Sequence, residues 1–403
     1  MLRSKRFLLP LCTVILVVLL FLEVLLQLPF DRDSHFDLLK PRSFEILDCL
    51  DPEVHEENML SEDDKLDAMG ETKIAHASEC TYPVFRRRPG KRLVLVLTYL
   101  RSGSTLTGDI LQQSPQAFYL YEPLKLYKSK IFLDGQACET AVMNCSQFNT
   151  SEILEVFGDL FRCRLQEHKR NILGPRKHSL AVMSAIPYCK SRPGFDTCMK
   201  MVQAICHHSN AIIVKTIRLS MEFVPRLLLK FPDLRIIHLL RDPRGTMDSR
   251  KRGGYLRKIK ISSSAKWLCE RIQTDVEYSK VLQRRFPNRI ITVLYEELAE
   301  NPIDMSNKLY RNLNLEFSDS FDEWIFNHTS AGNPNDSFYG TIRSNSTLTS
   351  QSWRKRLKLR DVRLIEDECK DVLNLLGFRK VNDEEDLKNT DKSLRLRSLY
   401  TLE

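Results

Sequence analysis

A short apolar run followed by a loop of small residues is the feature that most constrains this chain. Residues 93–97 predict a buried strand, and residues 98–106 continue it as Thr-Tyr-Leu-Arg-Ser-Gly-Ser-Thr-Leu. Small side chains let the backbone turn tightly, so that its N–H groups can surround an anion. A helix that begins near Thr105 would direct its dipole at the same anion. We therefore predict an anion-binding site formed by Arg101, Ser102, Gly103, Ser104, Thr105 and Leu106.

A second anion-binding set is predicted further along the chain. Residues 236–240 form a short β-prone run, which Asp242-Pro243 breaks. Arg241 therefore lies at the carboxyl end of a strand, where ligands bind in open parallel α/β sheets. Ser249 follows in the expected next helix. We predict that Arg241 and Ser249 hold one phosphate group together.

These two motifs resemble the donor-binding motifs of sulfotransferases. The loop at 98–106 is neither a Walker A nor a Rossmann sequence, and it is similar to the loop that holds the 5′-phosphosulfate of 3′-phosphoadenosine 5′-phosphosulfate (PAPS). Arg101 stands where Golgi carbohydrate sulfotransferases also have arginine. Arg241 and Ser249 resemble the pair that grips the 3′-phosphate of the donor. The two motifs also follow one another in the order that this superfamily has.

Three further segments resemble the galactose/N-acetylglucosamine/N-acetylgalactosamine 6-O-sulfotransferase family. They are residues 118–124 (Phe-Tyr-Leu-Tyr-Glu-Pro-Leu), residues 295–298 (Tyr-Glu-Glu-Leu) with Pro302, and residues 340–343 (Gly-Thr-Ile-Arg) with Trp353-Arg354. The resemblance runs from about residue 92 to residue 378. It implies PAPS as the sulfuryl donor, a reaction without a metal, and a donor contact by Arg343. Trp353 is expected to pack near that contact or to belong to the core.

The resemblance also makes Glu122 the candidate catalytic base. The apolar residues 118–121 before it are expected to raise its pKa and to suit it to proton transfer. The alternative is a glutamate that caps a helix or forms a salt bridge beside Pro123. Arg101 is assigned a catalytic role as well, because negative charge grows on the leaving phosphate oxygen and must be neutralised.

Other polar residues have less specific predictions. Lys215 and Arg218 follow a predicted strand and would approach the donor or an acidic sugar, or would be ordinary solvated charges. His238 lies inside a predicted strand and is expected to be a core residue. His207 and His208 are expected to be a surface pair.

The pattern of elements predicts the fold class. Four apolar runs indicate buried parallel strands, at residues 93–97, 211–214, 236–240 and 290–294. Helical periodicity appears at 264–286 and at 361–376, where Gly377 would end the helix. The alternation predicts an α/β, doubly wound parallel sheet with ligands at the strand carboxyl ends. With its P-loop-like phosphosulfate-binding loop, the resemblance implies the sulfotransferase fold. Residues 125–205 and 318–352 lack clear periodicity and are candidates for an acceptor groove.

The N-terminus predicts a membrane anchor. The basic tail at 1–6 precedes an apolar stretch at 7–28, which as one transmembrane helix could cross a bilayer. A cleaved signal peptide is the alternative, although no small-x-small cleavage site follows. The basic flank predicts a single-pass type II protein, with a lumenal stem at 29–90. The catalytic domain would span 91–380, and 381–403 would be a C-terminal tail.

Glycosylation sequons and cysteines agree with a lumenal domain. The sequons begin at Asn144, Asn149, Asn327, Asn335 and Asn345. Cys12 lies in the predicted anchor, and the other ten of the 11 cysteines lie beyond it, which suits disulfides in an oxidising compartment. Connectivity does not follow from the sequence. As hypotheses, short loops join Cys138 to Cys145 and Cys189 to Cys198, and Cys269 meets Cys369 between two helices.

Charge narrows the choice of ligands. The chain carries a formal net charge of +9. Residues 51–72 are acidic and are not expected to build a core, so the catalytic region is more basic than the whole chain. A basic domain suits an anionic donor and an acidic glycan. Nucleic acid is not expected, because a lumenal protein rarely meets it.

Together these features predict a Golgi membrane enzyme that transfers a sulfuryl group to a sugar hydroxyl. The acceptor would be the 6-OH of Gal, GlcNAc or GalNAc in a glycoprotein or proteoglycan glycan. Two alternatives stay open. A protein-tyrosine sulfotransferase would share the donor sites and the lumenal location, and a non-catalytic lumenal binding protein would share the fold.

Overall fold

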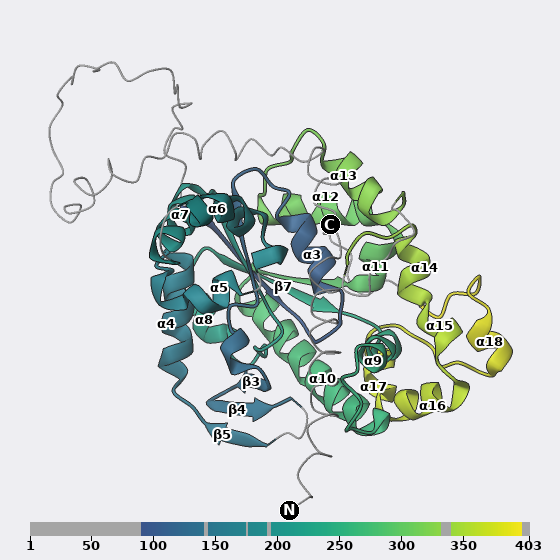
Figure 1. Cartoon of the computed structure of the whole chain (residues 1–403). Helices are drawn as coiled ribbons and strands as arrows, with labels where there is room; N and C mark the ends of the chain where they lie inside the picture. The colour runs from purple at the N-terminus through teal and green to yellow at the C-terminus, as the bar shows by residue number, and fades with distance from the viewer. Residues whose placement is uncertain (1–89, 141–143, 175, 192–194, 332–339, 397–403) are drawn as a thin grey trace, which may run out of the picture. The chain divides into compact units, whose positions relative to one another are not determined.

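The computed structural model describes residues 90–140, 144–174, 176–191, 195–331 and 340–396 (Figure 1). The predicted tail at 1–6, the anchor at 7–28 and the stem up to residue 89 lie outside these ranges, as does the sequon at Asn335. Among the helices in the described ranges, none combines the length and the apolar character that a membrane crossing requires.

A five-stranded parallel sheet forms the centre of the domain, in the order β2-β6-β1-β7-β8. Its strands are β1 (Arg92–Leu97), β2 (Ala117–Tyr121), β6 (Ala211–Thr216), β7 (Leu234–Leu240) and β8 (Ile290–Leu294). The four predicted strands are confirmed. The sequence reading did not identify the fifth strand, β2, which carries the aromatic run before Glu122.

The register brings the carboxyl ends of the strands to one edge of the sheet. Leu97 pairs with Thr216 of β6 and with His238 of β7, so that all three strands end close together. The Thr98 hydroxyl reinforces this edge by donating to the carbonyl of Leu239 over 2.8 Å. From β1 the chain continues to β2 at one edge of the sheet, whereas from the neighbouring strand β7 it continues to β8 at the other edge, so the direction reverses between β1 and β7. Such a switch point is where open α/β sheets bind ligands.

Helices pack on both sides of the sheet, as a doubly wound fold requires. One apolar cluster joins the sheet to α3 (Ser104–Leu111), α11 (Tyr295–Glu300), α12 (Pro302–Leu313) and α13 (Phe321–Thr329). A second cluster joins strand ends to α9 (Pro243–Arg252), α10 (Ile261–Arg285), α15 (Trp353–Arg356), α16 (Leu359–Glu368) and α17 (Lys370–Leu375). Figure 1 shows α15, α16 and α17 of this group near α9 and α10. The chain adds α8 (Val224–Lys230) between β6 and β7, and α14 (Ser346–Gln351) before α15.

The long segment between β2 and β6 is ordered, although its sequence shows little periodicity. A small antiparallel sheet, β3-β4-β5, opens it (Figure 1). Its elements are η1 (Lys125–Tyr127), β3 (Lys130–Leu133), β4 (Gln136–Glu139), β5 (Cys145–Gln147), α4 (Thr150–Phe161), η2 (Gln166–His168), α5 (Lys169–Leu173), η3 (Arg176–His178), α6 (Leu180–Ser191) and α7 (Phe195–His208). The strands, the 3-10 turns and α5 are short, and short elements leave weak periodic signals. The helices α4, α6 and α7 are longer, with 12, 12 and 14 residues, and the sequence analysis did not identify them.

The C-terminal part differs from the expectation in two places. The helix predicted at 361–376 is two helices, because α16 ends at Glu368 and α17 begins at Lys370, with Cys369 between them. Gly377 follows with φ 75°, the left-handed conformation expected of a residue that ends a helix. Residues 381–396, predicted as a tail, pack on the domain. They include α18 (Glu384–Lys388), buried Leu387 and Leu394, and Arg395, which forms an ion pair with Glu297 over 3.0 Å.

The predicted core histidine is confirmed. His238 is fully buried, and its ring nitrogens contact the hydroxyls of Tyr99 at 2.9 Å and Ser279 at 2.7 Å. The Tyr99 hydroxyl also donates to Asp275 over 2.9 Å. Burial lowers the pKa of His238 to about 4, so the ring is neutral near pH 7. This network fixes Tyr99 immediately before the small-residue loop.

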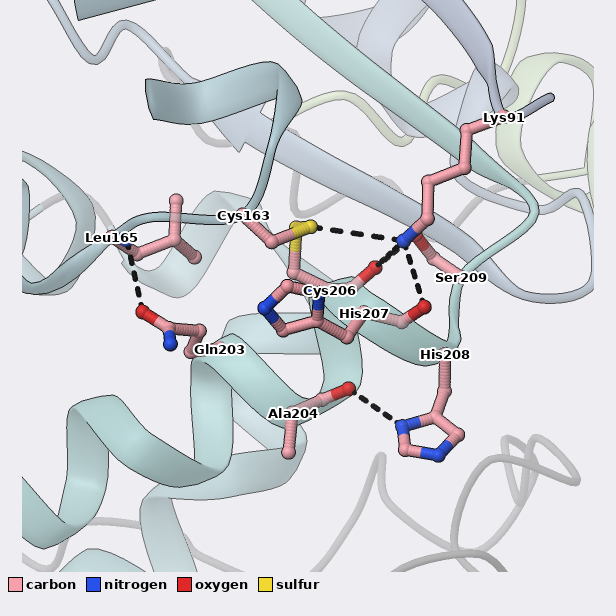
Figure 2. Close-up of a disulfide and its surroundings, with 9 residues drawn as sticks. All are labelled: Lys91, Cys163, Leu165, Gln203, Ala204, Cys206, His207, His208 and Ser209. Atoms are coloured by element: carbon pink, nitrogen blue, oxygen red, sulfur yellow. Dashed lines mark hydrogen bonds between the residues drawn. A yellow bond between two sulfur atoms is a disulfide. The ribbon is translucent and has the colours of Figure 1, made fainter. Parts of the chain in front are cut away.

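Disulfides join several of these elements. The bridges Cys138–Cys145 and Cys269–Cys369 are confirmed. The side chain of Cys189 lies outside the described residues, so its predicted bridge to Cys198 is not described. A third bridge, Cys163–Cys206, was not predicted (Figure 2).

Figure 2 shows how Lys91 supports the unpredicted bridge. Its ammonium group lies 3.8 Å from the Cys163 sulfur and donates to the carbonyls of Cys206 and His207 over 2.6 Å and 2.7 Å. These carbonyls belong to the last turn of α7, which favours a cation. Partial burial lowers the pKa of Lys91 to about 8. The contact ties the end of α7 to the residue before β1.

Of the two confirmed disulfides, Cys269–Cys369 is expected to stabilise the fold more than Cys138–Cys145. It joins α10 to the junction of α16 and α17. Cys269 and Cys369 are 100 residues apart, and Cys138 and Cys145 only 7. Because a bridge restricts the unfolded chain more when its loop is longer, Cys269→Ala/Cys369→Ala should lower the free energy of unfolding by about 2 kcal/mol more than Cys138→Ala/Cys145→Ala. Urea-induced unfolding of both double variants measures this difference, and an equal or larger loss in the short-loop variant would contradict it.

Candidate active site

The small-residue loop turns sharply between β1 and α3. The Ser102 N–H donates back to the carbonyl of Tyr99 over 3.2 Å, and both Arg101 (φ 71°) and Gly103 (φ 87°) have the left-handed conformation. The helix α3 begins at Ser104, as the sequence predicted within one residue, and its first backbone bond runs from Thr107 N–H to the carbonyl of Gly103 over 3.3 Å. The N–H groups before Thr107 have no acceptor within the helix, because the first turn of any helix leaves them unpaired. They form a helix N-terminus suited to an anion.

Gly103 makes this turn possible in two ways. Its φ of 87° is one that residues with a side chain rarely adopt, and a Cβ atom there would lie 2.1 Å from Cδ2 of the Tyr295 ring. Tyr295 follows β8 and is buried against the loop. The Tyr295 ring, at the start of α11, therefore limits where the loop can lie.

Gly103→Ala is expected to raise the KM for the donor at least about 10-fold, because the ring of Tyr295 must move and the loop with it. Gly135→Ala is the matched control. Gly135 has φ 70°, and a Cβ atom added there would have nothing within 4 Å, so alanine bears the same backbone cost of about 1 kcal/mol without a clash. Initial rates at varied donor concentration measure the effect. Equal KM values for the two variants would contradict the proposed role of the close contact.

The two predicted anion-binding sets are one connected cluster. Arg101 donates from Nε to the Ser249 hydroxyl over 3.0 Å, and Arg241 donates to the carbonyl of Arg101 over 2.9 Å. Arg241 follows β7, and Ser249 lies on α9. The helix α9 starts in a defined way, since the Asp242 side chain caps it by accepting from the Arg244 N–H over 2.8 Å. The sequence predicted each set, but not the direct contacts between them.

The charge of Arg241 is only weakly compensated by its neighbours. Its guanidinium lies 4.5 Å from the centre of the Tyr295 ring, and its Nε is 3.9 Å from Glu296. Burial, reinforced by the charge of Asp242, raises the pKa of Glu296 to about 8. Glu296 is therefore mainly protonated at neutral pH and does not cancel the charge of Arg241. The buried Nε of Arg241 has no hydrogen-bond acceptor among the described residues, which fits a site for an anionic ligand.

Glu122 lies in a different environment from the one predicted. It follows β2 with φ 48° and is buried, and Lys215 donates to its Oε1 over 2.6 Å while Arg218 donates to its Oε2. Burial alone would raise the pKa of Glu122, but the charges of Lys215 and Arg218 outweigh it and lower the pKa below 4.5. The expectation of an apolar, pKa-raising environment was therefore wrong, and the salt bridge considered as the alternative is present.

Aromatic rings hold the lysine of this cluster in place. The Lys215 ammonium lies 4.3 Å from the centre of the Tyr121 ring, and that ring stacks on His178 at 4.2 Å. Burial and nearby lysines lower the pKa of His178 to about 4, so it does not add a positive charge. Tyr121 and His178 come from β2 and from η3. The sequence offered no signal for this pairing, because the two residues meet only in the fold.

One cavity of about 920 Å³ contains both clusters. Its wall includes the loop and first turn of α3, Arg241, Ser249 and Tyr295, together with Glu122, Lys215 and Arg218. Glu122 is the one carboxylate among the described residues of the wall. The cations of the wall are Arg101, Lys125, Lys128, Lys215, Arg218, Arg241, Arg250, Arg252, Arg271, Arg343, Lys355 and Arg356. The cavity is therefore suited to anionic ligands.

The C-terminal segment closes another part of the wall. Arg343 lines the cavity, and its guanidinium donates to the carbonyls of Gly340 and Ile342 over 2.6 Å each. Thr341 anchors the segment to α3 by donating to Asp109 over 2.6 Å. Trp353 is buried 4.8 Å from the Arg244 guanidinium, in the second apolar cluster. Arg354 is buried as well, and donates to backbone carbonyls of residues 386, 387, 389 and 392, so it supports the fold.

Comparison with known proteins gives a consistent result. Residues 94–319, more than half of the chain, match the sequence model of the sulfotransferase family. Carbohydrate sulfotransferase 1 of Mus musculus is 27% identical over 351 residues, which cover 75% of this chain and 83% of that protein. Carbohydrate sulfotransferase 3 of Rattus norvegicus is 23% identical over 352 residues, which cover 75% of this chain and 71% of that protein. A solved sulfotransferase domain from the curacin biosynthetic pathway is 16% identical, with a TM-score of 0.41 over 73% of this chain and 100% of that domain. The chain belongs to the sulfotransferase family.

Proposed function

We propose that this chain transfers a sulfuryl group from PAPS to the hydroxyl of a sugar. The acceptor would be the 6-OH of Gal, GlcNAc or GalNAc in a glycoprotein or proteoglycan glycan. The observation that carries this proposal is the meeting of the anion-binding loop, Arg241 and Ser249 with the Glu122 cluster in one cavity of about 920 Å³. The names of the similar proteins, carbohydrate sulfotransferases, support a sugar acceptor.

The donor side of the cavity fits a ligand with two anionic ends. PAPS supplies an activated sulfuryl group together with phosphates at the 5′ and 3′ positions. The N–H groups of residues 102–106 and Arg101 would hold the 5′ end and stabilise negative charge that develops there. Arg241 and Ser249 would hold the 3′-phosphate, and Arg343 would contact the donor from the C-terminal segment. The contact between Arg101 and Ser249, at 3.0 Å, would keep the two ends at a fixed separation.

Glu122 would accept the proton of the attacking hydroxyl. Because its pKa is lowered, the carboxylate is ionised at neutral pH and is in the form that accepts a proton. Lys215 and Arg218 hold it in position from one neighbouring strand and the turn after it. Arg101 would act at the opposite end of the reaction, on the charge of the leaving group.

The cellular location is also part of the proposal. We place the chain in the Golgi membrane as a type II protein, with residues 7–28 as anchor and the catalytic domain in the lumen. The basic residues before the apolar stretch support this orientation. Three disulfides among the described residues support an oxidising compartment.

A transfer assay tests the proposed reaction. Full-length protein in microsomes would receive sulfur-labelled PAPS together with keratan-type, chondroitin-type and mucin-type glycans, each offered separately, beside an acidic tyrosine peptide. We expect label on a glycan and, after digestion of the product, sulfate on C6 of one sugar. Label on the peptide alone would replace the proposal with tyrosine sulfation. Donor binding without transfer to any acceptor would support a non-catalytic binding protein instead.

A further inference from the structure

A buried arginine of the cavity wall has no counterion. Arg250 lies near the end of α9, lines the cavity and is only 5% exposed. Burial and the charge of Arg271 lower the pKa of Arg250 to about 9, so its guanidinium still carries a charge at neutral pH. No carboxylate among the described residues forms an ion pair with it. Since a buried charge without a partner disfavours the folded state, an anion that reaches Arg250 through the cavity would be bound.

Two of the three guanidinium nitrogens of Arg250 have partners. Its Nε donates to the carbonyl of Leu100 over 3.2 Å, and its Nη1 donates to the Ser264 hydroxyl over 3.3 Å. Its Nη2 has no hydrogen-bond acceptor among the residues that the structure describes. Because both acceptors are neutral, they orient the guanidinium without balancing its charge. Arg250 therefore brings a positioned and uncompensated cation to the cavity.

Arg250 belongs to the part of the wall between the loop before α3 and the Glu122 cluster. Its contact to Leu100 places it at that loop. From the other side, Arg271 lines the same cavity and donates to the carbonyl of Leu219 over 2.8 Å, beside the cations that hold Glu122. The charge of Arg271 acts on Arg250, so the two arginines are neighbours. A sulfuryl group that passes from a donor in the loop to a hydroxyl near Glu122 must cross this part of the cavity.

The other anionic groups of the donor already have proposed ligands. The 5′ end is assigned to Arg101 and the first turn of α3, and the 3′-phosphate is assigned to Arg241 and Ser249. The oxygens of the sulfuryl group have no assigned ligand. We propose that Arg250 binds the sulfuryl group of PAPS and stabilises the negative charge on its oxygens during transfer, as a further catalytic residue. This inference rests on the proposed function of the cavity.

The step that Arg250 would assist is a displacement at sulfur. The bond between sulfur and the bridging oxygen of the 5′-phosphosulfate breaks, and its electron pair stays on the phosphate. A bond forms between sulfur and the sugar oxygen, and the hydroxyl proton passes to Glu122. The other three oxygens of the sulfuryl group share negative charge throughout, and a guanidinium held beside them lowers the barrier. Arg101 acts on the leaving phosphate instead, so the two arginines have different roles.

Two ligands that differ by the sulfuryl group test the inference. Isothermal calorimetry on full-length protein without acceptor measures Kd for PAPS and for 3′-phosphoadenosine 5′-phosphate, which lacks that group. In Arg250→Met, Kd for PAPS should rise at least about 10-fold, while Kd for the bisphosphate should change less than about 3-fold. For the glycan that wild-type protein uses, kcat should fall about 100-fold. Arg250→Lys restores the charge and should recover part of both losses.

A milder variant and a matched control accompany these measurements. Ser264→Ala removes the hydroxyl that orients Nη1 of Arg250, and it should weaken binding of PAPS about 3-fold more than binding of the bisphosphate. It tests the same contact if Arg250→Met does not fold. Arg289→Met is the control, because Arg289 donates to backbone carbonyls of residues 228, 231 and 234 and does not line the cavity. Both Kd values and kcat should stay at their wild-type values in folded Arg289→Met protein.

The possible results separate this inference from the proposed function. An equal loss for PAPS and the bisphosphate in Arg250→Met would assign Arg250 to the phosphates or to the loop, and unchanged PAPS binding and kcat would remove it from the site. Either result would overturn the inference while the proposed function stands. A fall of kcat only with anionic glycans, with PAPS binding intact, would assign Arg250 to the acceptor and also overturn it. Failure of wild-type protein to bind either ligand or to label any glycan would overturn the proposed function itself.

Discussion

Arg101→Ala is expected to lower kcat for sulfuryl transfer about 100- to 1,000-fold, the usual loss when one charge-stabilising donor is removed from an active site. Arg101 donates to Ser249 over 3.0 Å and lines the cavity beside the first turn of α3. Its planar guanidinium group would face the negative charge that develops on the leaving phosphate. Lysine retains the charge but not the two-pronged geometry, so Arg101→Lys should recover only part of the rate.

The fold should survive this substitution. Arg101 already has φ 71°, and alanine bears much the same cost there as arginine, so no new strain arises. Arg162→Ala, which removes an exposed arginine at the end of α4, is the matched control and should keep its wild-type rate. Steady-state kinetics and thermal unfolding of both variants measure the effect. A folded Arg101→Ala protein with undiminished kcat would remove Arg101 from the mechanism.

Glu122→Gln is expected to lower kcat about 100- to 10,000-fold, because amide replaces the group that accepts the proton. The substitution also leaves Lys215 and Arg218 buried beside a neutral partner, which should cost about 3–5 kcal/mol of stability. The affinity of the folded fraction for the donor separates the loss of the proton acceptor from the loss of stability. It should not change in folded protein, since Glu122 does not belong to the donor cluster. Glu297→Gln is the control, because Glu297 is a buried glutamate paired with Arg395 at 3.0 Å that does not line the cavity. Its kcat should stay close to that of wild-type protein.

The pH dependence of this step follows from the lowered pKa of Glu122. A carboxyl group whose pKa is lower in the folded than in the unfolded protein contributes stability above its unfolded pKa, and loses it as the pH falls through the folded pKa. The Glu122 pKa lies below 4.5, so its carboxylate and its ion pairs should persist throughout the neutral and mildly acidic range. An acid limb of kcat centred near pH 6 would show that another group is the base.

The strands and the loop between β1 and α3 could be predicted because each leaves a local signal. Residues 93–97 are uniformly apolar, and the change to small residues after Tyr99 marks the turn. Arg241 was placed correctly for the same reason, since Asp242-Pro243 ends the apolar run of β7. The resemblance of these segments to a known family then supplied their proposed roles.

The environment of Glu122 could not be read in this way. Its partners Lys215 and Arg218 are 93 and 96 residues away, and they approach it because β2 and β6 are neighbours in the sheet. The order of strands does not follow from the sequence, and β2 itself was not recognised. An apolar run before a glutamate therefore suggested an apolar site, whereas the fold placed two cations there.

Other contacts depend on tertiary structure to the same extent. The close approach of Tyr295 to Gly103 joins the start of α11 to the loop after β1. The bridge Cys163–Cys206 depends on how α7 packs beside the end of α4, and spacing along the chain favours no such pair. Residues 381–396 lack a long periodic stretch, yet Leu387 and Leu394 are buried in the second apolar cluster.

Binding of 3′-phosphoadenosine 5′-phosphate, the product that the donor leaves, tests the assignment of the cavity most directly, because it needs no knowledge of the acceptor. Isothermal calorimetry with full-length wild-type, Arg241→Ala and Glu122→Gln proteins measures it. We predict that wild-type and Glu122→Gln proteins bind alike, and that Arg241→Ala binds about 10- to 100-fold more weakly, as expected for the loss of a charge-assisted contact to phosphate. Equal binding by all three proteins, or no binding by folded wild-type protein, would contradict the assignment of this cavity as the donor site.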